Sequence, residues 1–322
     1  MQGIRKWLWM CAVAILSTNT LAQNYPNRPL RLIIPYTPGG ATDIIGRAVA
    51  NKLTETLGQS VLVDNRPGAN TIVGAEIASK ASPDGYTLFF GTLPTLVLNP
   101  ATYKKLPYDP LKDFASVAKL SEYFYFIVAR NGFPAKNIAE LVAYAKANPG
   151  KVTYGSTGEG SPSHLGGVLL ESLAGIKMVH IPYKGNSVTN LDLMGERLDF
   201  TMTGLPSIES LVKAGKLRLI ASTGLKRDPL YPEVATVDES GFPGYAVRTW
   251  FAIVTRAGTP RAIILRLNSE INRALQSPEV QKPLLDSGYE LAKGTPEDLD
   301  QLIRDEIPRW TRVAREANIS FD

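Results

Sequence analysis

The alternation of two kinds of segment most constrains what this chain can fold into. Short runs rich in β-branched residues, such as 30–35 (LRLIIP) and 217–222 (LRLIAS), alternate with longer segments whose apolar residues recur at the helical period. This alternation predicts an α/β fold in which helices flank mainly parallel sheets. Further strands are expected at 61–65, 87–91, 123–129, 152–155, 178–182, 200–203 and 250–255.

Two amphipathic helices are predicted in particular. In residues 42–57 the apolar face consists of Ile44, Ile45, Ala48, Val49, Leu53 and Leu57. Gly58 marks the end of this helix, because glycine readily adopts the left-handed conformation of a C-terminal cap. The second helix is expected in RAIILRLNSEINRALQSPEV, residues 261–280, and we expect it to pack back on the first part of the chain.

Two β-rich segments are longer than a typical strand of about five or six residues. They are 123–134 (YFYFIVARNGFP) and 245–260 (YAVRTWFAIVTRAGTP), and each ends in a Gly/Pro turn. Read as crossings between lobes, they divide the chain into a first lobe of 23–127 plus 252–322 and a second lobe of 128–251. The alternative is one continuous doubly wound domain.

The N-terminus has the pattern of a secretory signal peptide. Arg5 and Lys6 precede an apolar run at 7–16, and Leu21-Ala22-Gln23 offers a cleavage site after residue 22. The run is about half the length that spans a membrane, roughly 20 residues. The only cysteine, Cys11, lies in this leader, so the mature chain has neither thiol nor disulfide. We therefore expect a periplasmic protein that is not itself embedded in a membrane.

Charge and composition argue against several functional classes. The net charge is +5, or about +3 without the leader, and charges of both signs are interspersed. With no basic block, nucleic-acid binding is not expected. Two histidines and no clustered acidic pattern leave no candidate metal site, and no cofactor motif is present.

The stretch PYTPGGATD, residues 35–43, joins a predicted strand to a predicted helix. Gly39 and Gly40 leave the backbone unobstructed, so an anion can approach the first N–H groups of the helix and the positive end of its dipole. A P-loop lysine is missing and the glycine spacing does not match a dinucleotide fingerprint. A carboxylate or phosphate fits this turn. Alternatively, the glycines only make a tight turn, and Thr42 or Asp43 caps the helix.

A second stretch, 152–175, repeats the order of strand, Gly/Ser/Thr loop and helix. Its hydroxyls and open N–H groups suit a small carboxylate held between two loops. Ser161 and His164 also permit a hydrolase reading, with Asp192 or Asp199 as third member of a triad. No G-x-S-x-G elbow accompanies them, and Ser161 before a proline favours a helix cap. Arg66 is either a carboxylate partner or a brace for its own loop.

Together the motifs resemble the Bug family of extracytoplasmic solute receptors, the substrate-binding components of tripartite tricarboxylate transporters. In chain order they are YPNRPLRLIIPYTPGGATDIIGRAVANKL, VDNRPGAN, PDGYTL, YGSTGEGSPSHLGG, HIPYKG, LPSIESLVKAGKLRLIAST, FPGYAVRTWFAIVTRAGTP and LNSEINRAL. Two positions depart from the family pattern. Met202-Thr203 stands where the family often has Phe-Asp, which makes an amino-acid ligand less favourable, and Tyr36 stands where it often has phenylalanine.

The resemblance implies a two-lobe periplasmic binding protein of type II-like fold, without catalytic activity or cofactor. It implies a monomer that captures a small organic acid and presents it to the membrane subunits of such a transporter, or acts as a sensor. The ligand-binding residues expected on this basis are Tyr36, Pro38, Gly39, Gly40, Ala41, Thr42, Asp43, Arg66, Thr92, Ser156, Gly158, Gly160, Ser161, His164, Tyr183, Lys184 and Thr203.

Overall fold

The strands of the protein form two separate sheets. A computed structural model describes residues 25–286 and 288–322, so the predicted signal peptide and Cys11 lie outside the described residues. The first sheet consists of β1 (Leu30–Ile34), β2 (Val61–Asn65), β3 (Thr87–Thr92), β4 (Phe114–Phe124), β10 (Arg248–Arg256) and β11 (Glu290–Leu291). The second consists of β5 (Phe126–Arg130), β6 (Thr153–Ser156), β7 (Val179–Pro182), β8 (Phe200–Thr203) and β9 (Leu217–Ser222).

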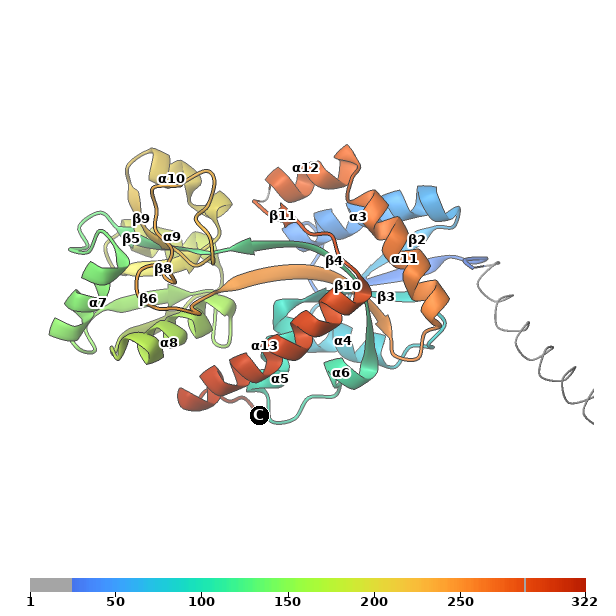
Figure 1. The fold of residues 1–322 in the computed structure, drawn as a ribbon, viewed down its shortest axis with the longest axis horizontal. Helices are drawn as coiled ribbons and strands as arrows, with labels where there is room; N and C mark the ends of the chain where they lie inside the picture. The colour runs from blue at the N-terminus through green and yellow to red at the C-terminus, as the bar shows by residue number, and fades with distance from the viewer. Residues whose placement is uncertain (1–24, 287) are drawn as a thin grey trace, which may run out of the picture.

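The strand orders are β11-β4-β10-β3-β1-β2 in the six-stranded sheet and β7-β6-β8-β5-β9 in the five-stranded sheet. Figure 1 shows the two sheets side by side, with β4 and β10 crossing between them. Both sheets are mixed rather than mainly parallel. β1 pairs in parallel with β2 and β3, and β6 with β7 and β8, whereas β10, β5 and β11 pair antiparallel with their neighbours. For β5 and β10 the reason is that a strand entering from the other sheet runs opposite to the strands it joins.

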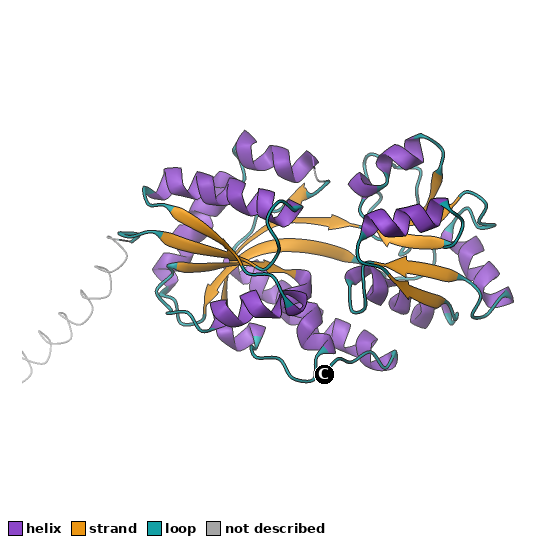
Figure 2. Cartoon of the chain, turned by 180° about the vertical axis from the view of Figure 1, so that it is seen from behind, coloured by secondary structure: helices purple, strands orange, loops and turns teal. Residues whose placement is uncertain are grey.

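Helices flank both sheets (Figure 2). With the six-stranded sheet are α3 (Ala41–Leu57), α4 (Ile72–Ser79), α5 (Asn99–Thr102), α6 (Pro110–Asp113), α11 (Arg261–Ala274), α12 (Pro278–Asp286) and α13 (Pro296–Glu316), and the short turns η1 (Ala69–Thr71) and η2 (Pro94–Leu98). With the five-stranded sheet are α7 (Ile138–Ala147), α8 (Pro162–Ala174), α9 (Asn186–Met194), α10 (Glu209–Lys213) and η3 (Leu205–Ser207). Of the helices in the described ranges, none is long and apolar enough to cross a membrane.

The predicted helix at 42–57 forms as α3, whereas the one predicted at 261–280 is divided into α11, which ends at Ala274, and α12, which begins at Pro278, because a proline disfavours helical conformation in the residue before it. In α3 the side chains of Ile45, Val49 and Leu53 are fully buried, and Gly58 adopts the left-handed conformation with its N–H donating to the Thr54 carbonyl. Ile44, which the periodicity placed on the buried face, is half exposed at the first turn. Helix α11 packs against α3 and β4, as expected for its return to the first part of the chain.

The first crossing is two strands rather than one, because Tyr125 interrupts it between β4 and β5. Thr223, which is fully buried, holds this break. The Tyr125 N–H donates to Thr223 Oγ1 over 2.8 Å, and that hydroxyl lies 3.0 Å and 2.6 Å from the carbonyl oxygens of Tyr125 and Val247. Since Val247 directly precedes β10, one side chain connects both crossing segments.

Helix α13 lies on the face of the six-stranded sheet opposite to α3, and it connects this sheet to the helices of the five-stranded sheet. It packs on β4 and α5 and also contacts α8 of the five-stranded sheet. Its Glu306, which is buried, accepts hydrogen bonds from Trp250 Nε1 over 3.0 Å and from Arg248 Nε over 2.9 Å, both on β10. One apolar core therefore continues on this face from one sheet to the other.

Strand directions decide where the predicted site residues lie. β3 is parallel to β1 and antiparallel to β10, which is antiparallel to β4. β1 and β3 thus run with β4, toward the five-stranded sheet (Figure 1). β6 and β8 run the opposite way, because β8 is antiparallel to β5 and parallel to β6. The C-terminal ends of these strands therefore face the boundary between the sheets, where α/β folds bind ligands.

Candidate functional site

The first loop, residues 35–40, joins the end of β1 to helix α3. Gly40 is the N-cap of α3 and no side chain caps this N-terminus, so neither Thr42 nor Asp43 takes the capping role. Thr37, Pro38, Gly39 and Gly40 are exposed. Gly39 has a φ of +87°, a backbone conformation that residues other than glycine rarely adopt. An exposed helix N-terminus without a side-chain cap attracts anions.

Asp43 organises this loop from within. Its carboxylate is buried and accepts hydrogen bonds from the Gly39 N–H over 2.9 Å, from Arg47 Nε over 3.0 Å and from Asn65 Nδ2 over 2.9 Å. Asn65 also donates to the Tyr36 carbonyl over 3.0 Å. Burial raises the pKa of Asp43, but the hydrogen bonds outweigh burial and hold that pKa below its usual value. The carboxylate is thus ionised and committed to the loop.

Tyr36 connects the loop to the interior of the six-stranded sheet. Its phenol lies 3.3 Å from Thr92 Oγ1 at the end of β3, and Thr92 lies 2.9 Å from Thr95 Oγ1. Burial raises the pKa of Tyr36, so the phenol keeps its proton near neutral pH. Arg66 is placed differently. Its side chain is half exposed and contacts the Asp64 carboxylate at 2.9 Å, so it braces its own loop through a carboxylate rather than through backbone carbonyls.

The second loop, residues 157–160, follows β6 and leads into α8. Ser161 is the N-cap of α8 and accepts from the His164 N–H over 3.3 Å, which confirms the capping interpretation. Its hydroxyl also donates to the Gly158 carbonyl over 2.7 Å. Ser156 Oγ donates to the same carbonyl over 3.0 Å. Gly158 and Gly160 have φ values of +128° and +71°, which explains why glycine occupies both positions.

His164 packs beneath this loop. Its Nδ1 accepts the Gly160 N–H over 3.0 Å, and its ring stacks on His180 of β7 at 3.7 Å between centroids. His180 Nε2 lies 2.6 Å from Ser156 Oγ. The tautomer of the His180 imidazole decides which of these two atoms donates. Burial lowers the pKa of His164 to about 4, with His180 as the second cause, and burial lowers the pKa of His180 to about 4.

Three predicted residues lie at the C-terminal ends of β7 and β8: Tyr183 and Lys184 follow β7, and Thr203 is the last residue of β8. The Tyr183 hydroxyl donates to Asp192 over 2.9 Å. Burial is the main cause, and this hydrogen bond the second, that raises the pKa of Tyr183 to about 12. Lys184 is exposed beside it. Thr203 is buried, and its Oγ1 lies 2.7 Å from Ser207 Oγ. The structure thus brings these residues to the boundary side of the five-stranded sheet, while Tyr36 and Thr92 lie on the boundary side of the other.

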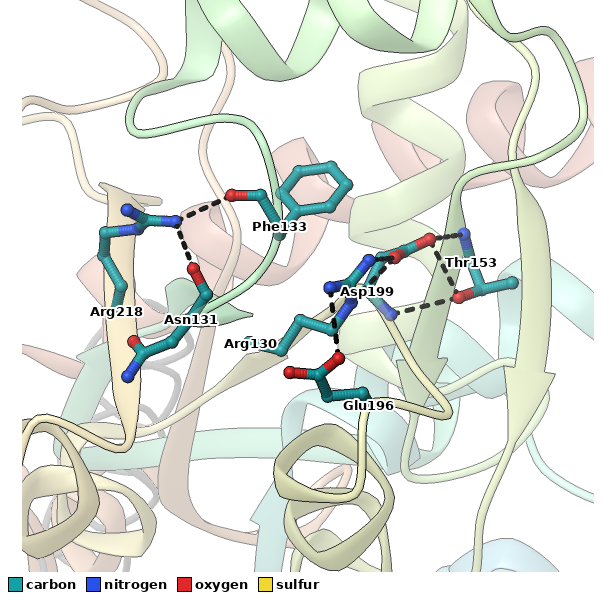
Figure 3. A network of polar contacts seen from close by, with 7 residues as sticks. All are labelled: Arg130, Asn131, Phe133, Thr153, Glu196, Asp199 and Arg218. Atoms are coloured by element: carbon teal, nitrogen blue, oxygen red, sulfur yellow. Dashed lines mark hydrogen bonds and ion pairs between the residues drawn. The ribbon is translucent and has the colours of Figure 1, made fainter.

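The two aspartates of the hypothetical triad are engaged elsewhere. Figure 3 shows Asp199 between Arg130 and Thr153. Arg130 donates to its Oδ1 over 3.0 and 3.1 Å, and the Thr153 N–H donates to its Oδ2 over 2.9 Å. Asp192 accepts from Arg197 Nε over 2.9 Å and from Tyr183. Neither is positioned to orient His164, whose Nδ1 is already an acceptor. In the described ranges, no group of three or more His, Cys, Asp or Glu residues is placed to hold a metal ion.

Sequence reasoning missed other residues at this boundary. A pocket of about 570 Å³ lies between the crossing strands, the segment after β9 and the segment around β11, and its lining includes Tyr123, Phe124 and Tyr289. The aromatic run YFYF at 123–126 was a signal for this pocket, although it was interpreted only as strand. His180, Asn65 and Thr95 were also missed as site residues, because their contacts come from tertiary placement.

Comparison with known proteins identifies the family. Residues 45–319 match the tripartite tricarboxylate transporter family receptor, TctC. The chain belongs to this family. Protein BugT of Bordetella pertussis is 33% identical over 306 residues, which cover 95% of this chain and 94% of BugT. The resemblance to Bug receptors predicted from the motifs is confirmed.

Two solved structures are similar over nearly the whole receptor. R. palustris Rpa4515 with adipate has a TM-score of 0.77 and 33% identity, covering 92% of this chain and 99% of its own. MatC (Rpa3494) from Rhodopseudomonas palustris with bound malate has a TM-score of 0.74 and 31% identity, covering 90% and 99%. The protein is thus a solute-binding receptor with the periplasmic binding protein fold. Because the family consists of receptors, the hydrolase alternative is wrong.

Proposed function

We propose that this receptor captures a small dicarboxylate between two lobes, with one carboxylate held by the loops after β1 and β6. The lobes are residues 23–127 plus 252–322, around the six-stranded sheet, and 128–251, around the five-stranded sheet. The observation that carries the proposal is the uncapped, exposed N-terminus of α3 at a strand end that faces the other sheet.

The chemistry of the two loops supports a carboxylate. In the first, Gly39 and Gly40 place no side chain over the positive end of α3, and Ala41 and Thr42 continue into its first turn. In the second, Ser156, Gly158, Gly160 and Ser161 form a hydroxyl-rich turn stabilised by His164. Each hydrogen bond to a charged group contributes about 1.5–3 kcal/mol. Closure of the lobes would bring the second loop against the carboxylate bound at the N-terminus of α3.

The remaining predicted residues set selectivity in this proposal. Tyr36 and Thr92 line the first lobe beside Pro38, while Tyr183, Lys184 and Thr203 line the second. Lys184 is exposed and cationic, so it suits the second carboxylate of an extended ligand. Adipate and malate, which the two solved relatives contain, are both dicarboxylates. Arg66 and Asp43 hold the shape of the first lobe's loops.

The proposal extends to location and partners, and the family and the N-terminal sequence pattern support this part. In this proposal, residues 1–22 direct export to the periplasm and are removed there. The mature receptor acts as a monomer, and it delivers its ligand to tripartite tricarboxylate transporter membrane subunits or reports its presence as a sensor.

A thermal-shift screen over organic acids tests the proposal. Dicarboxylates, tricarboxylates, aromatic acids and acidic amino acids are compared with the corresponding amides as uncharged controls. A bound acid stabilises the folded receptor by about 2.7 kcal/mol when present at about 100 times its Kd. We expect such a shift with at least one dicarboxylate and no shift with its diamide. If no acid shifts the transition and none co-purifies by mass spectrometry, the proposed function is wrong.

A further inference from the structure

A chain of buried hydroxyls leads from Tyr36 into the six-stranded sheet. Tyr36 Oη lies 3.3 Å from Thr92 Oγ1, Thr92 Oγ1 lies 2.9 Å from Thr95 Oγ1, and Thr95 Oγ1 lies 2.7 Å from Thr71 Oγ1. The three threonine side chains are at most 5% exposed, so bulk water does not complete their hydrogen bonds. Each hydroxyl has a single proton to donate, so the donor and acceptor of every pair in this hydroxyl chain can be assigned by counting protons and acceptors.

The inner end of the chain sets that direction. Thr71 Oγ1 donates to the Asn70 carbonyl, which can only accept. Asn99 Nδ2 donates to the same carbonyl over 2.8 Å and to Thr71 Oγ1 over 3.4 Å. Thr71 therefore has lone pairs left for Thr95, and Thr95 Oγ1 donates to it.

The outer end follows step by step. With its proton on Thr71, Thr95 accepts from Thr92, and Thr92 is then the donor of that pair. Thr92 Oγ1 also accepts the Thr95 N–H over 3.5 Å, which leaves one lone pair for Tyr36. Tyr36 must donate to it. The reversed direction would remove the bond from Thr71 to the Asn70 carbonyl without adding another inside the network, so it has one hydrogen bond fewer.

With its proton committed inward, Tyr36 Oη has only lone pairs left for a further partner. Among the residues that the structure describes, no group donates to Tyr36 Oη. A carboxylate placed there would set oxygen against oxygen. A hydroxyl or ammonium group on the ligand would donate to it.

We infer that Tyr36 selects a ligand with a hydrogen-bond donor beside its bound carboxylate, and that this donor is the hydroxyl of a hydroxy-dicarboxylate. This inference rests on the proposed function, and it specifies in addition that the bound dicarboxylate carries a hydroxyl group. An ammonium group has the same donor chemistry, but the position of Thr203 holds a neutral side chain rather than a carboxylate to balance an added positive charge.

Calorimetric titration of the mature receptor with succinate, the two malate enantiomers and aspartate tests this. In the wild type we expect one malate enantiomer to bind about tenfold more tightly than succinate, the equivalent of one hydrogen bond. Tyr36→Phe should weaken malate by that factor and leave succinate unchanged. Tighter binding of aspartate than of malate would overturn the assignment to a hydroxyl.

Thr92→Val is a second test that keeps the phenol. It removes the acceptor of the Tyr36 proton, so the phenol becomes free to donate, and the preference for malate over succinate should disappear. Thr255→Val is the matched control. Thr255 on β10 is as buried as Thr92, and its hydroxyl donates to the Thr87 carbonyl, which is not part of the hydroxyl chain that begins at Tyr36. Circular dichroism verifies folding. If dicarboxylates bind and neither variant changes the malate-to-succinate ratio, this inference is wrong while the proposed function stands. If no acid binds at all, both fail.

Discussion

His164 and His180 stack with their ring centroids 3.7 Å apart and 14° between their planes. His164 Nδ1 accepts the Gly160 N–H, which requires a neutral imidazole, and His180 Nε2 shares a hydrogen bond with Ser156 Oγ. The pair joins β7 to the loop after β6. The shape of that loop therefore depends on two side chains whose charge changes with pH.

Stability should fall as the pH drops from about 6.5 to about 4. Both histidines have a folded-state pKa of about 4, below the ordinary value near 6.5. Above pH 6.5 both states are neutral, and between 6.5 and 4 the unfolded chain takes up protons that the folded protein excludes. By pH 4 the two shifts together correspond to a loss of roughly 6 kcal/mol. Urea unfolding between pH 7.5 and 4 measures it.

The double variant His164→Asn with His180→Gln isolates this effect. Asn offers an acceptor oxygen in place of Nδ1, Gln offers an amide that can donate or accept in place of Nε2, and neither side chain titrates. Glu171, whose pKa burial raises, has the opposite pH dependence and remains in both proteins. The variant should lose stability less steeply than the wild type over this interval. Equal slopes would assign the pH dependence to other groups.

Thr223 should stabilise the crossing between the sheets through its hydroxyl. Thr223→Val keeps the shape but leaves the buried Tyr125 N–H without its acceptor at 2.8 Å. We expect a loss of about 1–3 kcal/mol in the free energy of unfolding, measured by urea denaturation. Thr223→Ser retains the hydroxyl and should lose less. A valine variant as stable as the wild type would mean that the crossing does not depend on this contact.

Strand positions could be predicted where the pattern is local. Strands 61–65, 200–203 and 217–222 have the predicted bounds, since each is an apolar or β-branched run bounded by turn residues. Residues 114–122, most of β4, were not predicted, because Lys119 and Glu122 interrupt the apolar pattern. The two-residue β11 is a strand only through its pairing with Ser121 and Glu122, which no local pattern reveals.

The candidate site was predictable to the same extent. Glycines at 39, 40, 158 and 160 marked both loops, because the positive φ of three of them is a local requirement of the chain. The direction of the hydrogen bond from Tyr36 depends on Thr71 and Thr95, which lie 35 and 59 residues further along the sequence. Such information exists only in the tertiary structure.

Ser161→Ala should act as the loss of a helix cap. The His164 N–H would lose its acceptor at the start of α8, which costs about 1 kcal/mol in stability. Since the loop before α8 would loosen, the affinity for the carboxylate should fall only a few-fold. Parallel thermal unfolding and calorimetry of the wild type and the variant measure both. Unchanged stability with abolished binding would mean that Ser161 contacts the ligand directly and contributes more to binding than to capping α8.

Asp43→Asn should weaken ligand binding although it removes a negative charge near the proposed anion site. The carboxylate accepts from Gly39, Arg47 and Asn65, whereas an amide has one acceptor oxygen and adds an N–H toward these donors. The loop would lose its shape, and we expect about a tenfold weaker affinity by calorimetry. Tighter binding by the variant would indicate that charge repulsion, rather than loop order, is the main effect of Asp43.

Gly40→Val should block the anion without disturbing the fold. Gly40 has a φ of −81° and a ψ of 170°, an extended conformation that valine adopts readily, and a Cβ placed there meets no atom within 4 Å. The added side chain would cover the first N–H groups of α3. With the loss of one or two charged hydrogen bonds, affinity should fall about 10- to 100-fold while the thermal transition of the free receptor stays the same. The affinity of Gly40→Ala, which adds a smaller side chain, should lie between those of the wild type and the valine variant. Wild-type affinity in the valine variant would place the ligand's carboxylate away from the N-terminus of α3.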